Sequence, residues 1–168
     1  KNDPKAFHGG DIRGVIEKLD YIESLGFTSI WLTPVFENMP DGYHGYWIKD
    51  FYEIDPQFGT KEDLQELVDE AHKRDMKVIL DFVVNHVGPG HPWVEEKPDW
   101  FHDELPIVLW NDQEQVETHW LFDLPDFKTE DPEVKDYLIE AATYWIEETG
   151  IDGYRLDTVR HVDKPFWE

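Results

Sequence analysis

The stretch TKEDLQELVDEAHKRDMKVILDFVVNH, residues 60–86, joins a helical pattern directly to a buried strand. Thr60 is a good helix N-cap, acidic residues fill the first turn, and apolar residues follow at helical spacing, namely Leu64, Leu67, Val68 and Ala71. The apolar run at 76–84 comes next and is typical of a strand buried on both faces. A helix leading into such a strand is the repeating unit of a parallel sheet with helices outside it.

The sequence before this stretch also has a helical pattern followed by a strand. Apolar residues at helical spacing predict a helix over residues 11–25, with Gly26 where a C-terminal cap is expected. The segment FTSIWLTPV, residues 27–35, then predicts a buried strand ended by Pro34. We expect Trp31 of that strand to lie in the core.

The sequence after residue 130 repeats the order a third time. Asp131 is a suitable N-cap, Pro132 occupies the first helical position, and Gly150 is placed to end the helix, whose apolar stripe includes Trp145. The segment GIDGYRLDTVRH, residues 150–161, predicts a third strand. The alternation indicates parallel strands with helices outside them.

This third strand turns abruptly charged. Arg155 and Asp157 stand two residues apart, so their side chains lie on the same side of a strand. Ions are costly to bury unless they are paired, and a guanidinium beside Asp157 favours the ionised carboxylate. Such a carboxylate suits a nucleophile or a stabiliser of positive charge. A structural ion pair at the strand end fits these residues equally well.

Residues 84–130 interrupt the alternation of helix and strand. The segment is long and rich in Pro, Trp, Phe and acidic residues, and we expect a small inserted subdomain. The predicted division is therefore 1–83, 84–130 and 131–168. Most tryptophans of the insertion should form its core, although their faces would also suit sugar rings: Trp93, Trp100, Trp110 and Trp120.

The number of strands sets the expected architecture. An eight-stranded (β/α)8 barrel needs about 250 residues, and only three strands are visible in 168. We therefore expect an α/β fold that is part of a TIM (β/α)8 barrel, about strands 2–4 with their helices. On this hypothesis the chain is a fragment, and its first partner is the remaining barrel of the parent chain.

Composition excludes some functions. The net charge of −23 argues against nucleic acid as a partner, because a polyanion needs a basic surface. The absence of cysteine excludes disulfides and thiolate chemistry. No stretch approaches the roughly 20 apolar residues of a membrane span, so no membrane partner is expected. These features leave the compartment open between secreted and cytoplasmic.

Charged and polar residues gather where the predicted strands end. The segment PVFENMPDGYHGYW follows the first strand, DFVVNH ends the second, and YRLDTVRH ends the third. In barrels the carboxyl ends of the strands hold the active site. We expect convergence there of Asp81, Asn85, His86, Arg155, Asp157 and His161.

These motifs carry a family resemblance over nearly the whole chain. DFVVNH (residues 81–86) and GYRLDTVRH (residues 153–161) resemble two signatures of the α-amylase family of retaining glycoside hydrolases. LPDF (residues 124–127) resembles a third, shorter signature, and GYHGYW (residues 42–47) also matches in order and spacing. The resemblance implies a barrel enzyme that acts on α-glucans.

The resemblance implies roles for the residues at the cleavage point. Asp157 matches the nucleophile that forms the glycosyl intermediate, and Arg155 matches its partner in the motif. Asp81 matches the residue that supports this arginine, and His86 one that contacts the sugar. Tyr46 resembles the aromatic platform for that sugar, with His44 beside it, although the residues alone favour a satisfied loop histidine at His44. Arg160 and His161 match residues that contact the sugar on the leaving side. Many family members carry Lys at the position of Arg160.

The resemblance also implies a structural Ca²⁺ ion. Its ligands match Asn85, Asp126 and the backbone carbonyl of His161, and oxygen ligands from separate loops suit Ca²⁺. The residues alone favour the plainer interpretation, in which Asn85 is a turn residue and Asp126 a solvated loop acid.

The expected function is retaining hydrolysis of α-1,4-glucosidic bonds. Thr158 resembles members that cut α-1,4 bonds, whereas many that cut α-1,6 bonds carry Val there. The family's acid/base glutamate would follow a fifth strand, and the chain stops at Glu168 before it, so the chain alone should be inactive. Alternatives are a cyclodextrin-degrading, neopullulanase-type or transglycosylating member, a non-catalytic barrel relative, or a metal-dependent barrel hydrolase using Asp81, His86, Asp157 and His161.

Overall fold

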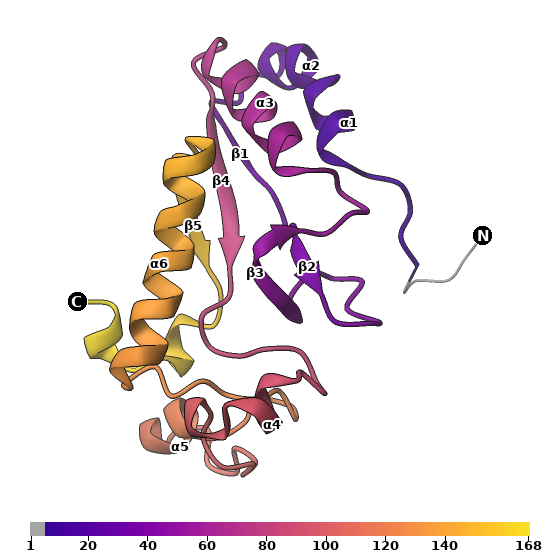
Figure 1. Ribbon diagram of the computed structural model, residues 1–168. Helices are drawn as coiled ribbons and strands as arrows, with labels where there is room; N and C mark the ends of the chain where they lie inside the picture. The colour runs from indigo at the N-terminus through magenta and orange to yellow at the C-terminus, as the bar shows by residue number, and fades with distance from the viewer. Residues whose placement is uncertain (1–5) are drawn as a thin grey trace.

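The computed structural model describes residues 6–168, and its centre is a three-stranded parallel sheet (Figure 1). The strands are β1 (Ser29–Trp31), β4 (Lys77–Phe82) and β5 (Gly153–Leu156), in the order β1-β4-β5. Strands that succeed one another through a helix thus lie side by side, as in a barrel. The prediction of a partial, unclosed parallel sheet is confirmed.

Two helices cover the sheet, and their sequence signals are confirmed. α3 (Lys61–His72) begins at Thr60, whose hydroxyl and the Asp63 carboxylate cap each other's backbone N–H groups. α6 (Pro132–Thr149) begins at the Asp131 cap and ends at Gly150, whose φ of 73° is left-handed. α6 runs alongside β4 and β5 (Figure 1).

The single helix predicted over residues 11–25 is wrong. The structure has α1 (Ile12–Ile16) and α2 (Leu19–Ser24), because the backbone of Lys18 leaves the helical region between them. The bend lets both helices place an apolar residue in the core, since Ile12 and Leu19 are both buried. The predicted cap at Gly26 has a φ of 84°.

An antiparallel ribbon that the sequence did not indicate stands beside the sheet. It consists of β2 (Phe36–Asn38) and β3 (Ile48–Ile54), with irregular register. The core lies between this ribbon, the sheet and α6. Phe36 and Phe51 both pack edge-on or tilted against Phe82, and the buried Trp145 donates its indole N–H to the Phe51 carbonyl at 2.7 Å.

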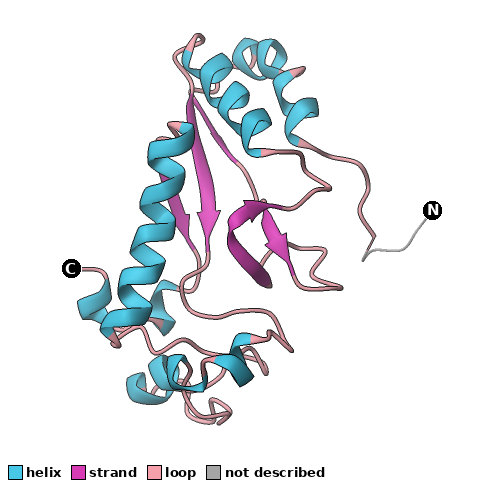
Figure 2. Cartoon of the chain, in the orientation of Figure 1, coloured by secondary structure: helices cyan, strands magenta, loops and turns pink. Residues whose placement is uncertain are grey.

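The inserted segment holds only short elements. They are α4 (Trp93–Glu96), η1 (Pro98–Trp100) and α5 (Gln113–Thr118), and they lie at the end of the sheet where β4 and β5 finish (Figure 2). Beyond β5 follow η2 (Val159–His161) and η3 (Lys164–Phe166).

The tryptophans of the insertion divide into two groups. Trp100 is buried and packs beside Trp93 and Phe127, as expected of a subdomain core. Trp110 is 47% exposed, so it does not belong to that core. The boundaries 1–83, 84–130 and 131–168 stay a prediction. Over the described residues, no helix combines the length and apolar character that a bilayer crossing requires.

Candidate active site

Arg155 is the centre of a cluster of charges at the carboxyl ends of β4 and β5. The register of these strands sets Arg155 opposite Asp81. Arg155 Nη1 donates to Asp157 Oδ1 at 2.7 Å and to both carboxylate oxygens of Asp81 at 3.1 Å. One guanidinium therefore holds two carboxylates that lie 76 positions apart along the chain.

Two aromatic side chains complete the surroundings of Asp81. The indole N–H of Trp31 and the hydroxyl of Tyr46 each donate to Asp81 Oδ2 at 3.2 Å. The Arg155 guanidinium lies 5.4 Å from the Trp31 ring centre and 6.0 Å from that of Tyr46, within the range of cation–π attraction. Asp81 thus holds Arg155 in place rather than facing solvent.

The expectation that Trp31 lies in the core is wrong, since it is 52% exposed. β1 has a strand partner on one side only, so one face of Trp31 stays uncovered. Sequence reasoning therefore missed its contact with Asp81. Only its place near a strand's carboxyl end could have indicated a role in the site.

The third strand is also less buried than its sequence indicates. The Arg155 side chain is 42% exposed and that of Asp157 19% exposed, whereas that of Asp81 is fully buried. β5 is the outer strand of the three, so within residues 6–168 no further strand covers its other edge. The Arg155–Asp157 pair is therefore attached to the core through the buried Asp81, and its Asp157 end is open to solvent.

Burial and pairing act against each other on these groups. Burial raises the pKa of Asp81 above its ordinary value, and the hydrogen bonds and charge of Arg155 oppose that rise. Burial alone would lower the pKa of Arg155, but its bonds to Asp81 and Asp157 raise it. The Arg155 guanidinium is therefore charged at neutral pH.

His86 is a buried histidine at the base of the site. Burial lowers the pKa of His86 to about 4, so the ring is neutral at pH 7, and the charges of Asp157, His161 and His44 also act on it. Its Nε2 lies 3.2 Å from the Tyr46 carbonyl, which can only accept, so this nitrogen carries the proton. Nδ1 is left to accept from the Asn85 amide at 3.2 Å.

The loop between β2 and β3 brings His44 and Tyr46 to this place. The Tyr46 N–H donates to His44 Nδ1 at 3.0 Å, and the two rings stack with centres 5.9 Å apart. Gly45 has a φ of 86°, and a Cβ there would lie 2.7 Å from the Pro34 carbonyl oxygen. Only glycine fits that turn, which sets the Tyr46 ring against Asp81 and Arg155.

Thr158, directly after Asp157, is a site feature beyond its use as a specificity signal. Its φ of 50° is left-handed, which is rare for a β-branched residue, and its Oγ1 is buried with no hydrogen-bond partner. Strain of this kind gathers at functional sites. The turn at Thr158 leads the chain away from the sheet into η2.

η2 carries Arg160 and His161 toward the inserted segment. Arg160 donates to the Trp110 carbonyl, and His161 Nδ1 lies 3.1 Å from the Val116 carbonyl. Burial lowers the pKa of His161. The segment after the nucleophile position is thus attached to the insertion.

Asn85 and Asp126 fit the oxygen ligands of a hard cation. An antiparallel bridge joins His86 to Asp126, and both Asn85 and Asp126 are buried. Asp126 Oδ2 accepts from His102 at 2.8 Å, whereas its Oδ1 is buried and has no partner. Burial raises the pKa of Asp126 to about 7. A buried carboxylate oxygen without a donor is the kind of group that a metal ion satisfies.

A larger ligand group does not form. Among residues 6–168, no set of three or more His, Cys, Asp and Glu side chains is placed to hold a metal ion. The set Asp81, His86, Asp157 and His161 of the metal-hydrolase alternative does not assemble, since Arg155 stands between Asp81 and Asp157. The Asn85–Asp126 pair would need backbone carbonyls or water to complete a coordination sphere.

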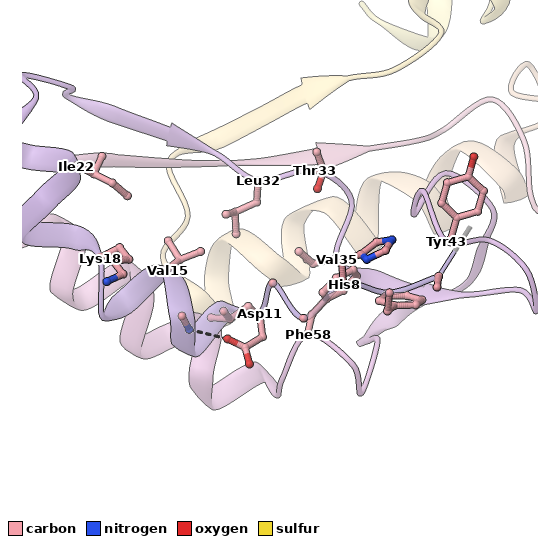
Figure 3. A pocket seen from close by; sticks show the side chains of 16 residues that line it. His8, Asp11, Val15, Lys18, Ile22, Leu32, Thr33, Val35, Tyr43 and Phe58 are labelled. Atoms are coloured by element: carbon pink, nitrogen blue, oxygen red, sulfur yellow. Dashed lines mark hydrogen bonds between the residues drawn. The ribbon is translucent and has the colours of Figure 1, made fainter. Parts of the chain in front are cut away.

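A separate apolar groove lies away from these charges. It has a volume of about 680 Å³ and is lined by α1, by the segment that follows β1 and by the segment before α1 (Figure 3). Leu32, Val15 and Ile22 form its wall, and Asp11 at its rim caps the Gly14 N–H at 2.6 Å. It belongs to the open edge of β1 and not to the site.

Comparison with known proteins agrees with this geometry. Residues 2–167 match the family described as "Alpha amylase, catalytic domain". The chain is 45% identical over 171 residues to a maltogenic α-amylase of Bacillus acidopullulyticus, covering 96% of this chain and 29% of the relative. It is 43% identical to a cyclomaltodextrinase of a Bacillus species, covering 98% and 31%.

Solved structures show the same similarity in three dimensions. The α-amylase of Geobacillus thermoleovorans, complexed with acarbose, superposes with a TM-score of 0.97 at 66% identity, over 99% of this chain and 38% of that one. An Anoxybacillus α-amylase has a TM-score of 0.96 at 62% identity, over 98% and 37%. The chain thus spans about a third of the length of these relatives. With the charged cluster at the strand ends and a family match over almost its full length, the chain belongs to the α-amylase catalytic domain family.

Proposed function

We propose that this chain supplies the nucleophile half of a retaining glycoside hydrolase active on α-1,4-linked glucans. The observation that carries the proposal is the Asp157 carboxylate, held at 2.7 Å by Arg155 at the end of β5, with one side open to solvent. Relatives named as amylases and a structure with bound acarbose support an α-glucan substrate.

In the proposed reaction each group has one task. Asp157 attacks the anomeric carbon and forms the glycosyl intermediate, while Arg155 fixes the direction of its carboxylate. Tyr46 supports the sugar ring at the cleavage point, beside the neutral His86. Arg160 and His161 contact the leaving-side sugar.

The proton for the leaving oxygen must come from a second carboxylic acid about 5–5.5 Å from the nucleophile. Asp81 is the other carboxylate of the cluster, but Arg155, Trp31 and Tyr46 all donate to it. It is therefore unsuited to give up a proton to substrate. We propose that the acid lies outside residues 6–168, in further segments of a closed barrel.

Asp157→Asn tests this assignment. The test protein is a chimera in which this chain replaces the matching segment of the Geobacillus thermoleovorans α-amylase, chosen for its 66% identity. The amide has the same shape but cannot form the intermediate, so kcat on soluble starch should fall by at least about 10³-fold. The melting temperature should stay unchanged.

The matched control is Asp103→Asn, an exposed acid of the inserted segment, which should keep full activity. Near wild-type turnover by Asp157→Asn would overturn the assignment. Product analysis on starch and on cyclodextrins in the same chimera separates hydrolysis from glycosyl transfer and from a preference for cyclic substrates.

We also propose that Ca²⁺ binds to Asn85, Asp126 and the His161 carbonyl. When bound it would join the inserted segment to the end of β4 and supply a charge for the unpartnered Asp126 Oδ1. A ligand that binds only the folded state raises the melting temperature, here by roughly 5 °C at saturating Ca²⁺. The measurement is melting of the chimera with Ca²⁺ and with chelator.

Asp126→Asn is the specific control, since it removes the charge and keeps the shape. It should abolish the Ca²⁺-dependent shift. The Ca²⁺ proposal would be contradicted by equal melting curves with and without chelator in a protein that contains no calcium by elemental analysis.

A further inference from the structure

Trp31, the last residue of β1, belongs to a row of side chains that crosses the sheet. The register pairs Trp31 with Ile79 of β4, and Asp81 lies two residues further along the same strand, so its side chain points to the same face. The indole covers this offset, since its N–H reaches Asp81 Oδ2 at 3.2 Å. Arg155 of β5 lies opposite Asp81 on the other side. The row therefore runs from Trp31 through Asp81 to Arg155, over three neighbouring strands.

The Asp81 carboxylate is held from both neighbouring strands. From β5, Arg155 donates to both of its oxygens at 3.1 Å, and from β1, Trp31 donates to Oδ2. The Asp81 side chain is fully buried, so protein donors and not bulk water decide its orientation. Tyr46 adds a bond from the loop between β2 and β3. Without the indole N–H, nothing on the β1 side would fix the plane of this carboxylate.

The Arg155 guanidinium is held by hydrogen bonds at a single atom. Within the described residues, its bonds to Asp81 and Asp157 all start from Nη1. A planar group held at one atom pivots about that atom unless a second contact fixes its plane. The Trp31 ring provides such a contact, because its centre lies 5.4 Å from the guanidinium carbon. One indole thus restrains both Asp81 and Arg155.

We propose that Trp31 is a positioning residue for Asp157. It acts through Asp81 and Arg155, whose Nη1 donates to Asp157 Oδ1 at 2.7 Å, and not on the sugar itself. This inference rests on the proposed function, in which Asp157 is the nucleophile. Correct aim of the carboxylate lowers the barrier to attack without changing how tightly the sugar is bound. Trp31 therefore contributes to kcat and not to KM.

The test is steady-state kinetics of the chimera on α-maltotriosyl fluoride. Fluoride leaves without a proton from an acid, so kcat/KM for this donor reports attack by the nucleophile. Trp31→Phe keeps a ring and removes the N–H, and should lower kcat about 10-fold with KM unchanged, since a hydrogen bond to a carboxylate is worth about that factor. Trp31→Leu removes the ring as well and should lower kcat about 100-fold.

The matched control is Trp145→Phe, the same substitution in the core. It loses the N–H bond to the Phe51 carbonyl and lies outside the charged cluster. This variant should lower the melting temperature by roughly 5 °C and leave kcat unchanged. If Trp31→Phe showed this same pattern, with a lower melting temperature and wild-type kcat, Trp31 would be structural and the proposal would be overturned.

Asp157→Asn, measured on the same donor, separates this inference from the proposed function. An inactive Asp157→Asn together with wild-type kcat in Trp31→Phe would overturn the positioning role and keep the nucleophile. Wild-type turnover by Asp157→Asn would reject the nucleophile, and the positioning role with it. Loss of activity in Asp157→Asn with a reduced kcat and unchanged KM in Trp31→Phe is the expected result.

Discussion

At the scale of single residues, His86 shows how burial sets chemistry. The ring is 2% exposed, and both its nitrogens have protein partners. The buried site leaves a protonated His86 ring without hydrating water, so protonation is unfavourable and the pKa of His86 falls to about 4. On the proposed function, a neutral, fixed ring beside Tyr46 adds shape to the site without adding positive charge next to the sugar.

This predicts a titration that can be observed directly. The folded-state pKa of His86 lies below the ordinary value near 6.5, so its contribution to stability is present above pH 6.5 and is lost as pH falls toward 4. The Cε1–H resonance of His86 should therefore not shift between pH 8 and pH 5.5. The same resonance in urea-unfolded chain should titrate near pH 6.5. A folded-state midpoint above 6 would contradict the burial argument.

Some of the site follows from the sequence at this scale and some does not. The shared direction of Arg155 and Asp157 follows from the two-residue period of a strand, and the 2.7 Å contact agrees with it. The bonds from Trp31 and Tyr46 to Asp81 do not follow, because they depend on a loop conformation and on an uncovered sheet edge. The orphaned Asp126 Oδ1 likewise depends on how the insertion folds back onto β4.

At the scale of elements, the two ends of β5 have different tasks. Asp157 at the carboxyl end carries the proposed chemistry, whereas Asp152 at the start joins β5 to its neighbours. Asp152 accepts from Lys77 at 2.8 Å, from His72 at 2.8 Å and from the Val78 N–H at 2.9 Å. Burial alone would raise the pKa of Asp152, but these three donors lower it to about 2.

Asp152→Asn should therefore lower stability at neutral pH by about 1 kcal/mol, after allowance for solvent screening of the exposed partners. A depressed carboxylate pKa stabilises the fold above the unfolded value near 3.9, and this contribution is lost as pH falls toward 2. Urea unfolding of the chimera at pH 7 and pH 3.5 measures both effects. The difference in the free energy of unfolding between Asp152→Asn and wild type should be smaller at pH 3.5 than at pH 7. The matched control is Asp157→Asn, which follows the other end of β5 directly. If the loss of stability in Asp152→Asn were the same at both pH values, the cause would be packing of the amide and not loss of the carboxylate charge.

Elements with strong local signals were predictable. The caps at Thr60 and Asp131 and the left-handed Gly150 are local chemistry, and α3 and α6 begin and end there. The ribbon of β2 and β3 has no such signal, because its pairing closes across the irregular loop that contains Gly45. The break at Lys18 was also missed, since both halves of the broken helix keep one continuous apolar pattern.

At the scale of the whole molecule, the sheet formed by the described residues has two open edges. β1 and β5 each pair with β4 alone, and the groove of about 680 Å³ beside β1 is lined by apolar side chains. Open strand edges and apolar grooves attract other chains. The charge of −23 opposes that attraction through repulsion between copies.

The 168-residue chain alone should therefore self-associate, and more strongly as salt is added. Salt shortens the screening length from about 30 Å at 0.01 M to about 3 Å at 1 M, which weakens the repulsion and leaves the apolar attraction. Light scattering coupled to size-exclusion chromatography at low and high salt measures the mass, and a dye that reports apolar surface measures the groove. A monomer at both salt concentrations, with no dye binding, would show that the edges are protected.

The single guanidinium between two carboxylates has a consequence for charge balance during the reaction. Arg155 faces Asp81 and Asp157, so the resting cluster carries one negative charge more than it can neutralise internally. The cationic sugar of a retaining glycosidase would supply the missing positive charge as the bond breaks. Once Asp157 is esterified, the remaining Arg155–Asp81 pair is neutral. On the proposed mechanism, the cluster is therefore least balanced when empty, and the positive charge that develops on the sugar offsets an excess of negative charge that is already present in the folded chain.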